Sequence, residues 1–382
     1  MKYIPYGSQF IDKKDIKLVT KSLTSDLITT GPFVKKFENN LKKYFKCKYS
    51  FVCSSGTAAL HLAMLSINLN KDDIILMPAI NFIASFNMAK IMGLKVYLVD
   101  VDEFTGQITP KNVQDCIKKN NLKKIKALIT MYLGGYPLNC KNFYDLKKTY
   151  GFYIIEDSCH ALGAEYKYKS KLYKVGSCKH ADISTFSMHP LKTITSGEGG
   201  IITTNNFKIA RNIQLYRNHG IYRSKKKHWN YDIIENGFNY RISDINCALG
   251  LSQLSKINFF LKKRKKIYEK YSRALKNFDQ KLSLPEYSNE IKSSFHLFLI
   301  NIKFKKLKKN KDHFLKYLNK NKIIAQQHYI PIYKFSINNF ISKKFSGSER
   351  YFKNTISIPI FVNLSIKNQN IILGKIKNYF NL

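Results

Sequence analysis

The sequence predicts an α/β protein with a large, mostly parallel β-sheet, followed by a smaller α+β domain. Short apolar runs alternate with segments of helical period through the first two thirds of the chain. The runs are almost continuously apolar, which is typical of strands buried on both faces. After Pro285 the pattern changes, and 382 residues are enough for two domains. We expect domains at residues 1–260 and 261–382.

The expected strands are short and bounded by turn residues. They cover residues 50–54, 74–78, 96–101, 127–133, 153–157, 183–188 and 200–204. Residues 57–67 and 109–119 have the period of helices. A lysine-rich run predicts one long helix over 251–276 that leads into the second domain. There we expect a strand at 295–304, an amphipathic helix with a solvated lysine face at 304–314, and a terminal helix.

The net charge is +40, from 65 Lys and Arg against 25 Asp and Glu. One interpretation is a polyanionic partner, as in a basic, non-catalytic regulatory or nucleic-acid-binding protein. The other is compositional drift, since Lys, Asn and Ile are abundant throughout. No RNA-recognition, helix-turn-helix or zinc-finger spacing accompanies the charge. The sequence therefore favours drift, with no nucleic-acid partner and with phosphate-bearing small molecules as the ligands that benefit.

The seven cysteines are scattered, and none forms a CxxC pair, so neither a disulfide framework nor a metal site is expected. The first ten residues lack the apolar core of a signal peptide. No stretch approaches 18 uninterrupted apolar residues, so no membrane span is expected. A reducing cytoplasm is the expected setting.

An anion site is predicted where the strand at 50–54 meets the next helix. In "CSSGTAAL", Ser55, Gly56 and Thr57 lead directly into that helix. Free amides at a helix N-terminus, together with hydroxyls, bind phosphate. An ordinary serine N-cap with a tight turn explains the same residues.

Other candidate groups follow the later strands. Asp157 ends a buried strand in "YIIEDSCHALGA", and His160 comes three residues later. A carboxylate there needs a cationic partner or hydrogen-bond donors, although a helix-capping role is equally consistent. Phe82, in the loop after the strand at 74–78, has a ring that would cover a planar ligand or simply pack in the core.

Lys192 lies in "FSMHPLKTITSGEGG", after a proline that ends the strand and before glycines that turn the chain back. The stretch is not a phosphate-binding Walker loop, because the order GxxxxGK[ST] is absent. A desolvated lysine has a depressed pKa and attacks carbonyls, whereas an exposed loop lysine does not. Further along, Arg241 and Asp244 have the spacing of a helical pair, and Asn239 has no evident local role.

Taken together, these groups match the needs of pyridoxal 5'-phosphate. The phosphate requires an anion site, and the pyridinium nitrogen requires a carboxylate that keeps it protonated. The ring requires a stacking partner, and the aldehyde requires a lysine with which to form a Schiff base.

In this order the motifs resemble the DegT/DnrJ/EryC1/StrS family of PLP-dependent sugar-nucleotide aminotransferases. The similarity spans nearly the whole chain, including "LITTGPFVKKFE", "CSSGTAALHLA", "IIEDSCHALGAEY", "FSMHPLKTITSGEGG" and "GFNYRISDINCALGLSQL". The resemblance implies the fold of PLP fold type I (aspartate aminotransferase-like) and a ping-pong transamination. Some relatives carry histidine at the position of Lys192 and catalyse dehydration instead.

The resemblance also implies a role for each matching position. Lys192 would form the Schiff base and move the proton, Asp157 would bind the pyridine nitrogen, and Phe82 would stack on the ring. His160 would lie near the phenolic oxygen, with Gly56, Thr57, Ala58 and Ser187 around the phosphate. Asn239 would reach the phosphate of the neighbouring subunit, which implies a homodimer with shared active sites.

Within the family, both ends of the chain are similar to transaminases of pseudaminic acid biosynthesis, a pathway of cell-surface polysaccharides. The resemblance implies that glutamate is the amino donor and that the acceptor is C4 of a UDP-linked 4-keto-6-deoxy-N-acetylhexosamine. Another nucleotide-linked 4-keto or 3-keto sugar, of the bacillosamine or perosamine type, is the alternative. The implied substrate-binding residues are Tyr6, Asp26, Leu27, Ile28, Thr29, Gln327, His328, Tyr329 and Ile330.

Overall fold

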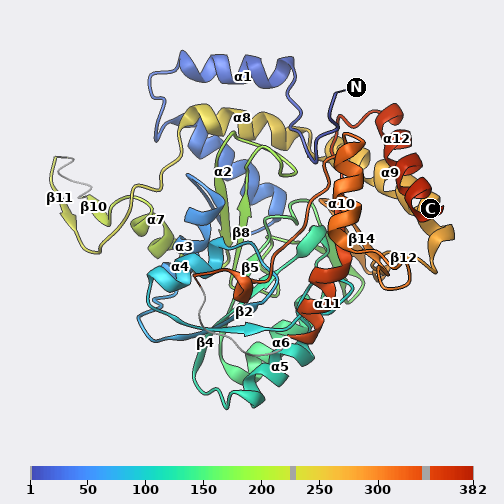
Figure 1. Ribbon diagram of the computed structural model, residues 1–382. Helices are drawn as coiled ribbons and strands as arrows, with labels where there is room; N and C mark the ends of the chain where they lie inside the picture. Colours follow the sequence, from blue (N-terminus) through green and yellow to red (C-terminus); the bar gives the residue numbers. More distant parts are fainter. Residues whose placement is uncertain (1, 224–228, 338–344, 382) are drawn as a thin grey trace.

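The computed structural model describes residues 2–223, 229–337 and 345–381, and its main body is a seven-stranded sheet (Figure 1). The strand order is β1–β9–β8–β5–β4–β2–β3. The strands from β8 to β3 run parallel, whereas β9 and β1 pair antiparallel at one end. The bounds are β1 Tyr49–Cys53, β2 Ile74–Pro78, β3 Lys95–Val99, β4 Ile125–Met131, β5 Tyr153–Asp157, β8 Ile183–Ser187 and β9 Gly200–Thr204.

Neighbouring residues of these strands pack on opposite faces of the sheet. On β5, Ile155 belongs to one hydrophobic core and Ile154 to the other, and on β2 Met77 and Leu76 divide in the same way. Both faces are therefore apolar, which explains the continuous apolar runs in the sequence. The first face is covered by α3 Gly56–Ser66, α4 Ala84–Ile91 and α7 Phe207–Tyr216. The opposite face is covered by α2 Pro32–Phe45, α5 Pro110–Lys119, α6 Cys140–Tyr150 and α8 Asp244–Ser255, with α1 Lys13–Leu23 beside α8 (Figure 1).

The structure confirms an α/β fold with a large, mostly parallel sheet. Every expected strand of that sheet is present within two residues of its predicted bounds. The expected helix at 109–119 begins one residue later, because Thr109 forms a capping box with Asn112 ahead of Pro110. Among the described residues, no helix is both long and apolar enough to cross a bilayer.

The prediction of one helix over 251–276 is wrong. α8 ends at Ser255, and α9 Ile257–Leu275 begins after a break at Lys256, whose φ is −105° and ψ is 7°. The Lys256 ammonium binds the carboxylates of Asp12 and Asp15 at 3.0 and 2.6 Å. These tertiary contacts hold the break, and nothing in the local lysine-rich pattern indicates them.

The helix expected at 304–314 is also wrong in its position. α10 Lys311–Lys320 begins after Asn310, whose side chain accepts a hydrogen bond from the His313 N–H at 2.8 Å. Lys308 has a φ of 50°, in the left-handed region, so the chain turns there before the helix begins. The apolar spacing was correct for a buried face, but the N-cap residue decided where the helix begins.

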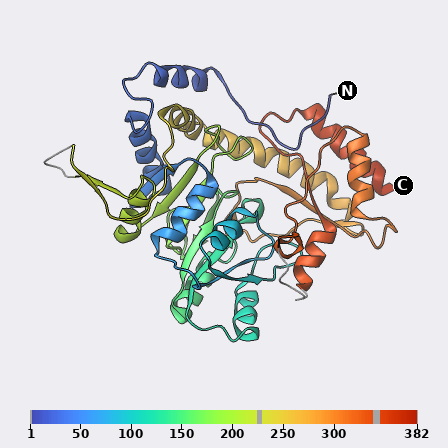
Figure 2. The ribbon, with the colours of Figure 1, turned by 60° about the vertical axis from the view of Figure 1, so that its left-hand side comes forward.

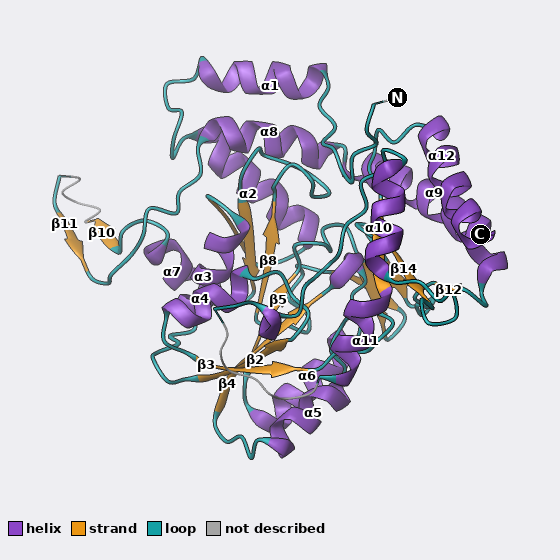
Figure 3. Cartoon of the chain, viewed as in Figure 1, coloured by secondary structure: helices purple, strands orange, loops and turns teal. Residues whose placement is uncertain are grey.

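The C-terminal part forms a second, antiparallel sheet with its own hydrophobic core (Figure 3). The sheet contains β12 Leu282–Ser283, β14 Phe298–Ile302 and β15 Thr355–Ile358, packed with α9, α10 and α12 Ile366–Asn381. α9 contributes to both cores, since Phe260 packs with the large sheet and Tyr271 with the small one. The division at residue 260 stays a prediction, because one helix runs through it.

Two further elements connect these parts. α11 Ser346–Asn354 is held at the end of β3, where the Asp100 carboxylate accepts the backbone N–H groups of Gly347 and Ser348 at 2.9 and 2.8 Å. β13 Ile291–Lys292 pairs with β6 Glu165–Tyr168, which in turn pairs with β7 Lys171–Lys174.

A hairpin of β10 Ile221–Arg223 and β11 Tyr231–Ile233 projects away from the body (Figures 1 and 2).

The sequence spacing predicts that Asp244 pairs with Arg241, but the two residues do not pair in the structure. Arg241 donates to the Asn218 side chain, and the fully buried Asp244 carboxylate accepts the N–H groups of Gly31, Phe33 and Val34 at 2.7, 2.7 and 3.2 Å. Asp244 thus caps the N-terminus of α2 across a long sequence separation.

We expect Asp244→Ala to lower the free energy of unfolding by about 3 kcal/mol, because it leaves these buried donors unpaired. Urea unfolding followed by circular dichroism measures the change. Asp115→Ala, which removes an exposed carboxylate, is the control and should leave the unfolding midpoint unchanged. Equal midpoints for the two variants would contradict the capping role.

Candidate active site

A cavity of about 490 Å³ lies at the carboxyl ends of β5 and β8, between the large sheet and the C-terminal part. In parallel sheets this edge is where ligands bind. Of the residues predicted from the sequence, the cavity is lined by Tyr6, Gly56, Thr57, Phe82, Asp157, His160, Ser187, Lys192, His328 and Tyr329. Residues far apart in the chain are therefore brought together in one place.

One end of the cavity is formed by the N-terminus of α3. Ser55 is its N-cap, with the side chain accepting the Ala58 N–H at 3.0 Å, so the ordinary capping interpretation also holds. Gly56 lets the helix approach β8 closely, because a Cβ at this position would lie 2.8 Å from the Cβ of Ser187. The helix N-terminus and the Ser187 hydroxyl thus face the same space, an arrangement suited to a phosphate.

Asp157 and Lys192 provide opposite charges in the interior of the cavity. Asp157 is buried and accepts the Cys159 N–H at 3.2 Å. Burial raises the pKa of Asp157, against the effects of the Cys159 hydrogen bond and the Lys192 charge. Burial also lowers the pKa of Lys192, although the nearby Cys159 and Asp157 act to raise it. A lysine with a lowered pKa is a better nucleophile, and a buried carboxylate favours a cationic ligand.

His160 and Phe82 approach Tyr329, which comes from the C-terminal part. The Tyr329 hydroxyl lies 3.0 Å from His160 Nε2, and the Tyr329 and Phe82 ring centroids are 5.7 Å apart. Phe82 is 52% exposed, so its ring is available to a ligand rather than packed in the core. The C-terminal part therefore closes the side of the cavity opposite the sheet.

Some predicted residues do not line this cavity. Ala58 lies within α3, and its N–H is already bound by Ser55. The others are Asn239, which is exposed beside the projecting hairpin, the exposed residues Asp26, Leu27, Ile28 and Thr29, and Gln327 and Ile330, which flank His328 and Tyr329. Their predicted contacts stay predictions.

Comparison with known proteins places this chain in a family. The sequence pattern of the DegT/DnrJ/EryC1/StrS aminotransferase family matches residues 9–377. The chain belongs to this family. It is a PLP-dependent sugar transaminase, as the resemblance of its sequence motifs predicted.

The aminotransferase has relatives similar over their whole length. It is 36% identical to a UDP-4-amino-4,6-dideoxy-N-acetyl-β-L-altrosamine transaminase of Campylobacter jejuni strain 81-176, over 96% of this chain and 94% of that protein. It is 29% identical to the GDP-perosamine synthase of Escherichia coli O157:H7, covering 100% and 99%. Among solved structures, Helicobacter pylori PseC, an aminotransferase of pseudaminic acid biosynthesis, has a TM-score of 0.90 at 28% identity with both chains fully covered.

The cavity of the aminotransferase suits pyridoxal 5'-phosphate. The α3 N-terminus and the Ser187 hydroxyl suit its phosphate, and the close approach at Gly56 leaves no room for a side chain there. A protonated pyridine nitrogen would give the buried Asp157 the cationic partner that burial demands. Lys192 lines the same cavity, and its side chain ends in an amine that could form a Schiff base.

Sequence reasoning missed several lining residues of the aminotransferase, among them His189, Glu198 and His296. The ring centroids of His296 and His160 are 4.2 Å apart, although the two residues are 136 positions apart in the sequence. His189 and Glu198 flank Lys192 in the sequence, so their proximity to it was a usable signal. His296 had no local signal, because only the folded chain brings it to the cavity.

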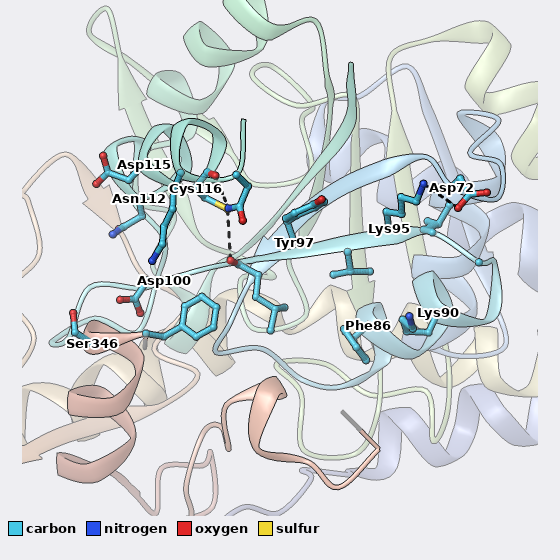
Figure 4. Close-up of a pocket in the computed structure, with 17 residues that line it drawn as sticks. Asp72, Phe86, Lys90, Lys95, Tyr97, Asp100, Asn112, Asp115, Cys116 and Ser346 are labelled. Atoms are coloured by element: carbon cyan, nitrogen blue, oxygen red, sulfur yellow. Dashed lines mark hydrogen bonds and ion pairs between the residues drawn. The ribbon is translucent and has the colours of Figure 1, made fainter. Parts of the chain in front are cut away.

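A second concavity of about 770 Å³ lies along the outer edge of β3 in the aminotransferase (Figure 4). It is larger but contains none of the residues predicted for the cofactor. Three of its charged groups already have partners, since Lys95 pairs with Asp72 at 3.2 Å within the concavity and Asp100 caps α11. The smaller cavity around Lys192 is therefore the candidate active site.

Glu156 precedes Asp157 but faces the opposite side of the sheet of the aminotransferase. The hydroxyls of Tyr132 and Ser184 donate to its buried carboxylate. Burial raises the pKa of Glu156 above its ordinary value of 4.5, so the folded state holds this proton more tightly than the unfolded state. The resulting stabilisation is complete below pH 4.5 and is lost as the pH rises through the folded pKa.

We expect Glu156→Gln to gain stability relative to the wild type as the pH is raised from about 4 to about 8, because glutamine has no proton to lose. Urea midpoints measured across this range test the expectation. A difference between the two proteins that does not change with pH would contradict it.

Proposed function

We propose that this enzyme transfers an amino group from glutamate to C4 of a UDP-linked 4-keto-6-deoxy-N-acetylhexosamine. The observation that carries the proposal is the 36% identity, over 96% of the chain, to a Campylobacter transaminase named for the corresponding 4-amino sugar. The resemblance to the Helicobacter structure at TM-score 0.90 supports the same sugar class. The reaction would belong to pseudaminic acid-type nucleotide-sugar biosynthesis.

In this proposal each cavity residue has a chemical task. When bound, the cofactor supplies a carbonyl that takes up the amino group and a ring that accepts electrons. Lys192 forms the covalent bond to the cofactor and, once released, moves a proton as general base and acid. Asp157 keeps the pyridine nitrogen protonated, Phe82 covers the ring, and His160 lies beside its phenolic oxygen. Thr57 and Ser187 hold the phosphate at the N-terminus of α3.

The competing substrate is another nucleotide-linked keto sugar. The relative that acts in GDP-perosamine synthesis is 29% identical over the full chain, so it supports this alternative less strongly. The discriminating experiment assays the purified protein with glutamate and a panel of UDP-, GDP- and dTDP-linked keto sugars. We expect the fastest turnover with the UDP-4-keto-6-deoxy-N-acetylhexosamine. Faster turnover of a GDP- or dTDP-linked sugar would overturn the sugar assignment and leave the transaminase class intact.

We further propose a cytoplasmic homodimer of PLP fold type I with shared active sites. Asn239 and residues 26–29 are exposed and lie outside the cavity of their own chain. The nearby hairpin carries exposed apolar side chains at Tyr222, Trp229 and Ile233, which suit burial against a second copy. A molar mass in solution of twice that of one chain, measured by light scattering, is the expected result.

A further inference from the structure

A concavity of about 810 Å³ lies between α1, α2 and the C-terminal end of α8, apart from the active site. It is lined by five lysines and shares no lining residue with the active-site cavity. No described acidic residue lines it, whereas three lysines and three aspartates line the concavity along β3. The charge here is therefore of one sign, and we call this site the lysine groove.

Lysines line the groove from both sides. α1 contributes Lys14, Lys17 and Lys21, and α2 contributes Lys36 and Lys43. Positions three, four or seven apart lie on the same side of a helix, so each set forms a row along its helix. All five residues are exposed. Two rows of ammonium groups therefore flank one concavity, an arrangement that suits an anionic partner with several phosphates.

The acidic residues of α1 and α2 do not neutralise these lysines. Each helix carries four lysines but a single acidic residue. Asp15 of α1 is buried and binds the Lys256 ammonium at 2.6 Å, and Glu38 of α2 binds Arg217 at 2.5 Å. Among the ion pairs of the described residues, none includes a lysine of α1 or α2. The charge of the groove is thus available to a partner.

α1 also exposes apolar side chains. Ile16 and Leu23 are 59% and 56% exposed, and their spacing of seven positions places them on one side of the helix. α1 lies at the edge of the molecule, as both views show (Figures 1 and 2). A peripheral helix that carries lysines together with exposed apolar residues suits the surface of an anionic bilayer.

A nucleic acid would use the lysines but not Ile16 and Leu23. In single-stranded nucleic acids the bases also need ring faces on which to stack. Tyr44 is the aromatic residue among the described residues that line the groove, and the Lys174 ammonium lies over its ring, 5.0 Å from the centroid. The exposed apolar side chains therefore favour a bilayer over a nucleic acid.

We propose that α1 and α2 dock the enzyme on an anionic phospholipid surface. The lysine groove binds the headgroup phosphates, and Ile16 and Leu23 enter the boundary between headgroups and acyl chains. Docking of this kind needs no membrane-spanning helix. Each lysine near such a surface strengthens binding roughly fivefold. The inference goes beyond the proposed function and does not depend on which sugar is the substrate.

The test measures co-sedimentation of the holoenzyme with vesicles of phosphatidylcholine alone, and of phosphatidylcholine with phosphatidylglycerol at about two to one. The groove variant carries Lys14→Gln, Lys17→Gln, Lys21→Gln, Lys36→Gln and Lys43→Gln. Because the whole chain is basic, a control variant loses the same charge from exposed lysines elsewhere that form no ion pair among the described residues. It carries Lys111→Gln, Lys118→Gln, Lys123→Gln, Lys208→Gln and Lys262→Gln. A third variant, Ile16→Ser, keeps every lysine.

We expect the wild type to bind the anionic vesicles at least about tenfold more tightly than phosphatidylcholine alone, with the difference lost as NaCl rises from about 0.1 to about 0.5 M. The groove variant should bind the anionic vesicles at least about a hundredfold more weakly, and the control variant should stay within about threefold of the wild type. Ile16→Ser should bind about fivefold more weakly, because it buries less apolar area.

Two further measurements separate docking from folding. The molar mass by light scattering, and turnover of the keto sugar that the wild type uses fastest, should be unchanged in every variant. If the groove variant does not fold, the three α1 substitutions alone replace it, with an expected loss of at least about tenfold.

Equal losses in the groove and control variants would overturn the proposal, because binding would then follow net charge alone. A wild type with no preference for anionic vesicles would overturn it as well. Double-stranded DNA of mixed sequence is titrated in parallel, and a groove variant that loses affinity for DNA but not for vesicles would assign the groove to nucleic acid instead. Unchanged binding in Ile16→Ser would overturn the bilayer assignment.

Discussion

Lys192→Ala is expected to lower transaminase activity by at least about a thousandfold, because in the proposed function one amine both bonds the cofactor and moves the proton. The residue lines the cavity beside the buried Asp157, and burial lowers its pKa, which favours a nucleophilic amine. The steady-state rate with glutamate and the keto sugar measures the loss. The absorbance band of a Schiff base between the cofactor and the protein should be absent as well, since the proposed bond is to this lysine.

Two substitutions separate this role from general effects of charge. Lys192→Arg keeps a positive charge but replaces the amine with a guanidinium that stays protonated, so it should be as inactive as Lys192→Ala. Lys208→Ala removes an exposed lysine of α7 and should leave activity unchanged. Substantial activity in Lys192→Arg would show that charge, rather than the amine, is what the site requires.

Asp157→Asn is expected to have the second largest effect, a loss of activity of roughly a hundredfold. The substitution retains the shape but removes the buried negative charge that would pair with the pyridinium nitrogen. Leaving a buried charge without its partner costs about 3 kcal/mol, which corresponds to the expected factor. The rate of the half-reaction with glutamate, followed by the change in cofactor absorbance, measures it without any sugar.

Glu156→Gln is the matched control, because Glu156 precedes Asp157 on β5 but faces the opposite side of the sheet. It makes the same change of carboxylate to amide outside the cavity and should retain the wild-type rate. Equal losses in the two variants would indicate a general effect on β5 and contradict a specific role of Asp157.

Much of the large sheet was predictable because both faces of its strands are buried. β4 and β5 contain short apolar runs at residues 127–129 and 154–155, and such runs can be recognised in the sequence without tertiary information. The positions of Asp157 and Ser187 at strand ends followed from the same pattern, as did the placement of Gly56 and Thr57 at a helix start. Because parallel strands end at one edge, these residues were expected to meet.

Other features depend on contacts that local sequence does not contain. The break at Lys256 is held by Asp12 and Asp15, and the start of α10 is decided by Asn310. His296 reaches the cavity only through the packing of the C-terminal part on the large sheet. The helical spacing of Arg241 and Asp244 was misleading, because the stronger interaction of Asp244 is with the distant N-terminus of α2.

Covalent trapping is the direct test of whether Lys192 bonds the cofactor. The purified holoenzyme is reduced with borohydride, digested, and analysed by mass spectrometry. We expect a phosphopyridoxyl group on the peptide that contains Lys192, at that lysine, and none in protein treated with glutamate beforehand. A label on a different lysine, or no label in protein that contains the cofactor, would contradict it.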